Sequence, residues 1–247
     1  MRTDEYAPGY SAPMVSFMAQ RTAEDHAGFF LPHLQPGSCV LDAGCGPGTI
    51  TLGLARKVAP AHVIGIDVED SQFEQARAVV KHERLDVEFR KESIYELPFE
   101  RHQFDAVFSH AVLEHLSDPA VALAEFRRVL KPGGVIGLRA GDLGGLLIDA
   151  DSEGPAQAFA SYLAQQKQEA KDPQVGRKLA RLMRQAGFSV ETMTAFYEVI
   201  SDLLMKMGPL LAEQFTSPGR FCNLQDRPAT PSIFVALAWC EATGHAV

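Results

Sequence analysis

A loop at residues 42–48, with the sequence Asp-Ala-Gly-Cys-Gly-Pro-Gly, could hold a charged ligand against the protein backbone. Its glycines at positions 44, 46 and 48 permit a tight turn and a close approach of the backbone to a ligand. The residues after Gly48 have the apolar spacing of a helix, and the start of a helix offers unpaired N–H groups and a positive dipole end. The loop therefore favours binding of a carboxylate or a phosphate.

The same loop departs from the glycine fingerprint of dinucleotide-binding proteins. That fingerprint is G-x-G-x-x-G, and its third glycine, counted from Gly44, falls on Thr49. Asp42 stands in the strand just before the loop, where a carboxylate suits a ligand that carries an ammonium group. NAD lacks such a group, so we favour a different nucleoside ligand. A glycine-rich turn without any ligand is the alternative.

Asp67 is the second acidic candidate, at the end of an apolar run over residues 63–67. An acid about twenty residues after a glycine loop accepts hydrogen bonds from the two ribose hydroxyls of a nucleoside. The alternative for Asp67 is a cap for the helix expected to begin near Ser71. With the glycine loop upstream, the ribose role is the stronger interpretation.

The elements that must position these residues alternate along the chain between apolar strands and amphipathic helices. This alternation predicts a parallel sheet with helices on both faces, in which ligands bind beyond the carboxyl ends of the strands. The glycine loop and both acids fall at such ends. The strands are expected at residues 38–42, 63–67, 87–90, 104–108, 135–139, 188–200 and 232–242, and the helices at 13–34, 49–58, 71–82, 119–130, 154–171, 175–186 and 201–215, with a turn at 131–134.

The composition argues against several other classes of protein. The chain has 247 residues, a formal net charge of −8 and 46% hydrophobic residues, which is unlike a nucleic-acid-binding protein. No run approaches the roughly 20 apolar residues that span a bilayer, and the first residues do not resemble a signal peptide. The four cysteines show no CxxC spacing, so a zinc site is not expected. We expect a cytoplasmic protein that acts on a small molecule, without nucleic acid or membrane insertion.

Several segments resemble the motifs of class I S-adenosylmethionine (SAM)-dependent methyltransferases. Residues 40–49 (VLDAGCGPGT) resemble the first motif and residues 65–67 (GID) the second, while residues 96–99, 104–107 and 130–134 resemble later ones. The similarity covers roughly residues 20–140 and is greatest to the small-molecule branch typified by ubiquinone and menaquinone C-methyltransferases. It implies that the chain moves a methyl group from SAM to O, N or C of a small-molecule acceptor.

The resemblance also implies the fold and its organisation. It predicts a Rossmann-like, doubly wound α/β fold, whose seven-stranded sheet has the order 3-2-1-4-5-7-6 with strand 7 antiparallel. One domain would comprise residues 1–247. Within it, residues 1–37 would form a helical flap, residues 38–140 the SAM-binding core, and residues 141–247 the substrate-side helices and last two strands. A homodimer is left open.

Position by position, the resemblance implies which residues hold SAM. Asp42 and the loop backbone would face the methionine part, Asp67 the ribose, and Val68 and Gln72 the adenine. Ser93 stands where the family usually carries an Asp that reads the adenine amino group. Arg21 would pair with the SAM carboxylate, unless it is an ordinary surface arginine. The full expected set is Arg21, Asp42, Gly44, Cys45, Gly46, Asp67, Val68, Gln72, Ser93, Ile94 and His110.

Methyl transfer from a sulfonium mainly requires alignment and exclusion of water, and it needs a general base only if the acceptor must lose a proton. The catalytic candidates are His110, expected just after the fourth strand, Arg139, at the end of the fifth, and His115 in the Leu-Glu-His pattern that follows His110. His115 could equally be a structural histidine. Arg139 could grip a substrate carboxylate or belong to a structural ion pair. No metal is expected, because His, Asp and Glu do not recur at metal-ligand spacing.

Two other functions are compatible with parts of the sequence. One is a nicotinamide-dependent dehydrogenase, against which Thr49 and Asp42 both argue. The other is a SAM-binding protein without catalysis, acting as a regulator or scaffold. No residue excludes the second alternative, although the polar candidates His115 and Arg139 argue mildly against it.

Overall fold

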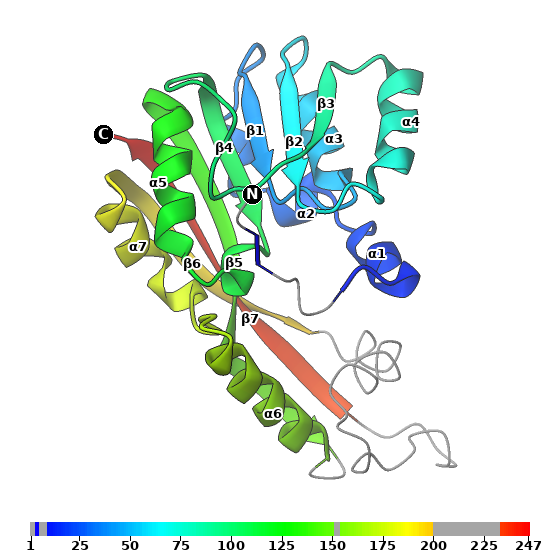
Figure 1. Ribbon diagram of the computed structural model, residues 1–247, viewed down its shortest axis with the longest axis vertical. Coiled ribbons are helices and arrows are strands. Elements are labelled where there is room, and N and C mark those ends of the chain that lie inside the picture. The colour runs from blue at the N-terminus through cyan, green and yellow to red at the C-terminus, as the bar shows by residue number, and fades with distance from the viewer. Residues whose placement is uncertain (1–2, 5–8, 151–153, 200–232) are drawn as a thin grey trace.

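One sheet of seven strands, in the order β3-β2-β1-β4-β5-β7-β6, organises the computed structural model (Figure 1). The structure describes residues 3–4, 9–150, 154–199 and 233–247. Strands β1 to β5 pair in parallel, whereas β7 is antiparallel to both β5 and β6. The strand order and the antiparallel strand implied by the resemblance are therefore confirmed. The strands are β1 Val40–Ala43, β2 Val63–Asp67, β3 Val87–Lys91, β4 Phe104–His110, β5 Leu130–Ala150, β6 Phe188–Val199 and β7 Ile233–Ala246.

Helices cover both faces of this sheet because successive strand residues point to opposite sides. Val40 packs in one buried cluster with Phe30 and with Leu54 of the helix after β1, whereas Leu41 packs in another with Phe126 and Leu179. β1, β2, β4 and β5 each contribute buried residues to both of these clusters. The helices are α1 Ala12–Met18, α2 Ala23–His26, α3 Thr49–Val58, α4 Phe73–Glu83, α5 Pro119–Val129, α6 Gly154–Gln168 and α7 Leu179–Gln185, with 3-10 turns η1 Leu31–His33, η2 Leu113–His115 and η3 Gly176–Lys178.

The single helix predicted over residues 13–34 is wrong, because α1, α2 and η1 divide this segment. α2 begins anew after Thr22, whose hydroxyl accepts a hydrogen bond from the Asp25 N–H at 3.1 Å. Such a cap satisfies one of the unpaired N–H groups at a helix start, which favours a new helix over a continuous one. The segment therefore bends twice before it enters β1.

β5 differs most from the prediction, since it runs over 21 residues from Leu130 to Ala150. The predicted turn at residues 131–134 is an irregularity inside β5, where Gly133 has a φ of 74°. Arg139, the last residue of the predicted strand, lies well inside β5, because β5 goes on pairing with β7 beyond this point. A register shift after Asp142 absorbs the glycines that looked like the end of a strand.

Most other predicted elements agree with the structure to within a few residues. β4 continues two residues further than predicted, so His110 is its last residue rather than the start of a loop. The predicted helix over 175–186 consists of η3 followed by α7. The helix predicted over 201–215 lies outside the described residues. Within the described part of the chain, no helix is both long and apolar enough to cross a membrane.

Candidate active site

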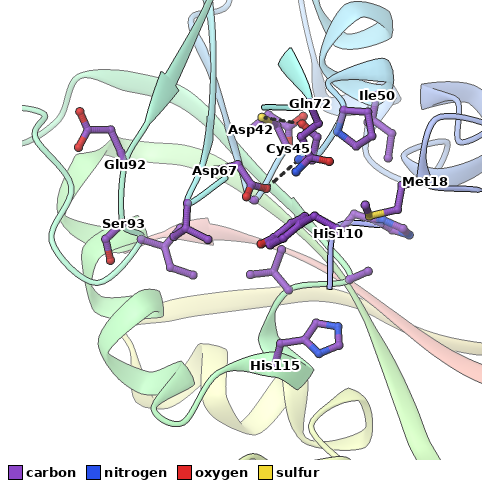
Figure 2. Close-up of a pocket in the computed structure, with 18 of the residues that line it drawn as sticks. Met18, Asp42, Cys45, Ile50, Asp67, Gln72, Glu92, Ser93, His110 and His115 are labelled. Atoms are coloured by element: carbon purple, nitrogen blue, oxygen red, sulfur yellow. Dashed lines mark hydrogen bonds between the residues drawn. The ribbon is translucent and has the colours of Figure 1, made fainter. Parts of the chain in front are cut away.

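A cavity of about 960 Å³, including its open mouth, lies at the carboxyl ends of β1, β2 and β4 (Figure 2). All eleven residues expected to hold SAM line it, and so does His115, whereas Arg139 does not. The other lining residues are Thr3, Asp4, Tyr10, Met18, Pro47, Thr49, Ile50, Glu92, Tyr95, Ala111, Val112 and Leu116.

The glycine loop needs glycine both for its backbone angles and for its close packing. Gly44 and Gly48 have φ values of 81° and 82°, in the left-handed region that other residues rarely adopt. A Cβ on Gly44 would lie 2.2 Å from Cγ2 of Val112, and one on Gly48 would lie 2.6 Å from the Phe89 ring. The Gly44 N–H donates to the Ile66 carbonyl at 2.8 Å, so β2 holds the loop in place. No side chain caps the start of α3, so its first N–H groups are open to a ligand.

Asp67 links the end of β2 to this loop. Its Oδ2 accepts a hydrogen bond from the Gly46 N–H at 2.9 Å, and its Oδ1 accepts one from the Glu69 N–H at 3.1 Å. Burial raises the pKa of this carboxyl, although the backbone N–H groups oppose that shift. Asp67 does not cap α4, whose N-cap is Gln72 without a side-chain bond. The capping alternative is therefore wrong, and the carboxylate lines the cavity instead.

Asp42 is a buried acid whose side chain has one hydrogen-bond partner among the residues that the structure describes. It is 3% exposed, and its Oδ2 accepts a hydrogen bond from the Thr51 hydroxyl at 2.7 Å. Burial raises its pKa to about 7, with the nearby Asp67 charge adding to the effect and the Thr51 bond opposing it. A cation placed in the cavity beside Asp42 would compensate the buried negative charge.

Two further lining residues carry buried polar atoms that no described group satisfies. Both the amide nitrogen and the amide oxygen of Gln72 lack a hydrogen-bond partner among the described residues, and so does Nε2 of His110. Buried polar groups are almost always hydrogen-bonded in native proteins. Their position on the cavity wall (Figure 2) therefore fits a site that binds a polar ligand.

Aromatic neighbours hold the His110 ring in place. It stacks on Trp239, with ring centroids 5.4 Å apart, and meets the edge of His26 at 5.2 Å. Burial lowers the pKa of His110 well below its ordinary value, and the positive charges of Arg21 and Arg139 lower it further. His110 is therefore neutral at physiological pH and can accept a proton or a hydrogen bond.

His115 lies lower on the cavity wall, in η2 (Figure 2). Burial lowers its pKa to about 3, and the charges of Lys171 and Arg21 add to that shift. A histidine with so low a pKa is a weak base at neutral pH. Burial lowers the pKa of His110 as well, so the pKa shifts do not distinguish the two histidines as proton acceptors.

Arg139 lies outside the cavity in a cage of aromatic and acidic groups. Its guanidinium sits 4.7 Å from the Phe196 ring centre and 4.9 Å from that of Trp239. It donates to the Asp25 carbonyl at 3.0 Å and pairs with Glu198 at 3.3 Å. These contacts correspond to the structural ion pair that the sequence left open. Arg139 adjoins the site through the ring of Trp239 and through its backbone, whose carbonyl accepts a hydrogen bond from the Ala111 N–H at 2.9 Å.

One acid of the site, near the N-terminus, was not predicted from the sequence. Asp4 lines the cavity, and it accepts hydrogen bonds from the Tyr95 hydroxyl and from the Ser117 N–H and hydroxyl. Its pKa is lowered because these hydrogen bonds outweigh its burial. Asp4 lies in a short polar terminal stretch beside Glu5, and no motif or spacing there points to a binding site.

Comparison with known proteins supports the resemblance. A family model described as a methyltransferase domain matches residues 41–138. The chain is 40% identical over 145 residues to an uncharacterised methyltransferase of Schizosaccharomyces pombe, covering 56% of this chain and 52% of that protein. It is 40% identical over 99 residues to a ubiquinone biosynthesis O-methyltransferase of Hahella chejuensis, covering 40% and 41% of the two chains.

The fold is also similar to that of solved methyltransferase structures. A SAM-dependent methyltransferase of Aquifex aeolicus superposes with a TM-score of 0.60 at 17% identity, covering 97% of this chain and 100% of that one. The chain spans about half the length of the first curated relatives it matches. The methyltransferase domain over residues 41–138, the relatives and the strand order together support a class I SAM-dependent methyltransferase.

Proposed function

We propose that this protein transfers a methyl group from SAM to O, N or C of a small molecule. One observation carries the proposal: a single cavity brings together the glycine loop and two acids, Asp42 and Asp67, at the carboxyl edge of the sheet. The chemistry of this set matches a nucleoside that also bears an ammonium group. The ubiquinone biosynthesis O-methyltransferase among the relatives supports a small molecule as acceptor.

The residues present fit SAM in both charge and hydrogen bonding. Asp42 would oppose the ammonium group, and the free N–H groups at the start of α3 would face the carboxylate, together with Arg21. Asp67 keeps unused lone pairs for the two ribose hydroxyls. The unsatisfied amide of Gln72 can pair with a polar edge of the ligand. The remaining expected contacts come from the backbone of the loop and from Val68, Ser93 and Ile94.

The acceptor would bind where the sheet extends past this edge. The last pair between β4 and β5 is His110 with Arg139, yet β5 goes on pairing with β7 as far as Ala150. Figure 1 shows these strands running on beyond β1 and β4, with α6 beside them. We therefore assign residues 38–140 to the donor, residues 141–247 to the acceptor, and residues 1–37 to covering the site.

The chain's own part in the reaction would be to orient the reactants, exclude water and accept a proton where necessary. When bound, SAM supplies an electrophilic methyl group on a sulfonium. His110 offers a neutral imidazole whose Nε2 has no partner among the described residues. That nitrogen can accept a hydrogen bond from a hydroxyl or amine of the acceptor and so orient it for attack. The stack on Trp239 fixes the direction of the ring.

The variant Asp67→Ala tests the donor site. Loss of hydrogen bonds to a charged acceptor should weaken SAM binding by about 1.5–3 kcal/mol, or roughly 10- to 150-fold, measured by calorimetry. Asp70→Ala is the matched control, because Asp70 lies on the same loop but pairs with Lys91 at the surface. Unchanged SAM affinity in Asp67→Ala would remove the ribose assignment.

Binding and catalysis need separate measurements. NADH binding without SAM binding would overturn the proposed donor and favour a dehydrogenase. SAM binding without formation of S-adenosylhomocysteine, across a broad panel of hydroxyl, amine and carbon acceptors, would favour a SAM-binding protein without catalysis. Trp239 is the chain's one tryptophan, so its fluorescence reports ligand entry next to His110.

A further inference from the structure

His33, Glu191 and His245 meet on the surface of the protein, although they come from three distant parts of the chain. His33 belongs to η1, Glu191 to β6 and His245 to β7. One potential ligand atom from each side chain lies within 4.8 Å of the other two. Because the three residues are far apart in the sequence, no local spacing could indicate the cluster.

This cluster lies at the opposite edge of the sheet from the cavity. β4 and β5 run in parallel, with Ala106 opposite Val135 near their amino ends and His110 opposite Arg139 at the carboxyl end of β4. His245 pairs with Val135, so it belongs to the amino edge. Whatever binds there is separated from the methyl-transfer site by the length of the central strands.

The hydrogen bond made by one ring nitrogen of His245 decides what the other nitrogen can do. Nδ1 of His245 lies 3.2 Å from the Gly133 carbonyl oxygen, which can only accept, so Nδ1 carries the hydrogen. In the neutral ring, Nε2 then presents a lone pair to Oε2 of Glu191 at 3.1 Å. Two acceptors at this distance need either a shared proton or a cation between them.

The position of His33 favours the cation. Its Nδ1 lies 3.8 Å from the same Glu191 oxygen, so a second imidazole nitrogen faces the point where the first two groups meet. A shared proton would join only Glu191 and His245, whereas a cation could bind these two side chains and His33 together. Ligands of a tetrahedral ion at about 2.0–2.2 Å lie roughly 3.3 Å apart, and these side chains need only small movements to reach that arrangement.

We propose that His33, Glu191 and His245 form a binding site for a divalent transition-metal ion, with Zn²⁺ as the best match. Two imidazoles and one carboxylate suit Zn²⁺, whereas Mg²⁺ and Ca²⁺ prefer oxygen ligands alone. The bond from His245 to the Gly133 carbonyl supplies the outer contact that orients metal-binding histidines. The side chains are 23%, 48% and 41% exposed, so the ion can enter from solvent and retain water in its open positions.

The bound ion would tie the N-terminal segment to the edge of the sheet. η1 belongs to the segment that precedes the central strand β1, whereas β7 and β6 are the last two strands in the order of the sheet. A ligand that binds only the folded chain raises its stability by mass action. The ion is therefore expected to stabilise the fold without entering the reaction.

The test titrates Zn²⁺ into the full chain, free of purification tags and stripped of metal with a chelator. One equivalent of Zn²⁺ should bind and raise the thermal unfolding temperature, which Trp239 fluorescence can follow. Glu191→Gln, which keeps the shape of an exposed side chain, should weaken Zn²⁺ binding about tenfold or more. His33→Gln should have a similar effect, since it removes a ligand from a different segment.

His62→Gln is the matched control. His62 is another partly exposed histidine with acidic neighbours, Asp86 and Glu88, but no second histidine is part of that contact. It should bind Zn²⁺ as the unchanged chain does, and SAM affinity should be the same with and without Zn²⁺. No Zn²⁺ binding by the unchanged chain, or equal binding by Glu191→Gln, would show a shared proton or simple ion pairs and overturn the proposal.

Discussion

The half of the sheet formed by β1 to β4 and the half formed by β5 to β7 are specified in different ways. In the first half, backbone conformation determines which residues a position allows, because Gly44 and Gly48 have left-handed φ angles and no room for a Cβ atom. In the second half, contacts between side chains determine the arrangement, because Arg139 is held between the rings of Phe196 and Trp239. A backbone requirement restricts a position to glycine, whereas an aromatic cage forms between residues far apart in sequence.

The largest expected effect comes from Gly48→Ala, which breaks the backbone rule of the first half. A methyl group there must adopt a left-handed conformation and displace the ring of Phe89, which stacks on Phe73. We expect a loss of about 2–5 kcal/mol in the free energy of unfolding, from backbone strain and overpacking together, and a loss of SAM binding. Urea denaturation and calorimetry measure the two effects.

Gly37→Ala separates the two causes. Gly37 also has a positive φ, 94°, but a Cβ there meets no atom within 4 Å. This control should lose only the strain, about 1–2 kcal/mol, and should bind SAM normally. Equal losses in both variants would show that the contact with Phe89 contributes nothing, and that packing does not restrict this position to glycine.

The same contrast explains what the sequence could predict. The glycine loop, Asp42 and Asp67 lie at the ends of short apolar runs, so their position at the carboxyl edge follows from the alternation of strands and helices. Val63–Asp67 and Thr49–Val58 were predicted to the residue, because each has a strong periodic pattern and a clear stop. The local sequence pattern was sufficient to predict an element wherever local interactions determine its structure.

Elsewhere local pattern was insufficient. The strand was predicted to end at residue 139, before the glycines at 141, 144 and 145, yet antiparallel pairing with β7 keeps this segment extended. For Arg139 the sequence left a substrate contact and a structural ion pair equally open, because its partners Glu198 and Trp239 come from β6 and β7. Asp4 and the cluster at His33 likewise depend on contacts between segments, which one sequence does not display.

Asp42→Asn tests how the buried charge of Asp42 affects the stability of the first half. The folded-state pKa of Asp42, about 7, lies above its ordinary value of 3.8, so the folded chain holds the proton more tightly than the unfolded chain. The free energy of unfolding therefore falls as the pH rises from about 4 to 7. Asparagine removes this loss, so without ligand the variant should be more stable at pH 8, on the order of 2–4 kcal/mol. Thermal unfolding at pH 4 and pH 8 measures the difference.

Ligand binding should change in the opposite direction. SAM affinity of the unchanged chain should fall as the pH drops below 7, because the ammonium group binds the charged form of Asp42. Asp42→Asn should bind SAM weakly and lose this pH dependence. Asp70→Asn, at the surface, should retain both the affinity and the pH profile. Tight, pH-independent SAM binding by Asp42→Asn would separate Asp42 from the ammonium group.

The smallest of these effects is expected from Arg139→Met, which tests the second half. Methionine keeps an apolar chain between Phe196 and Trp239 but removes the charge that pairs with Glu198. Arg139 is 4% exposed, whereas Glu198 is partly exposed and can be hydrated, so we expect a loss of about 1–2 kcal/mol in the free energy of unfolding. SAM affinity should stay unchanged, because Arg139 does not line the cavity.

Arg56→Met is the control from the first half, since Arg56 pairs with Glu83 through two hydrogen bonds of 2.7 Å but is half exposed. Exposed ion pairs contribute little, so its denaturation midpoint should move less than that of Arg139→Met and should be the more sensitive to salt. A weaker SAM affinity in Arg139→Met would show that the aromatic cage acts on the cavity through Trp239 and His110. The two halves would then be coupled at that stack, and the division between a backbone-determined donor side and a side-chain-determined acceptor side would fail there.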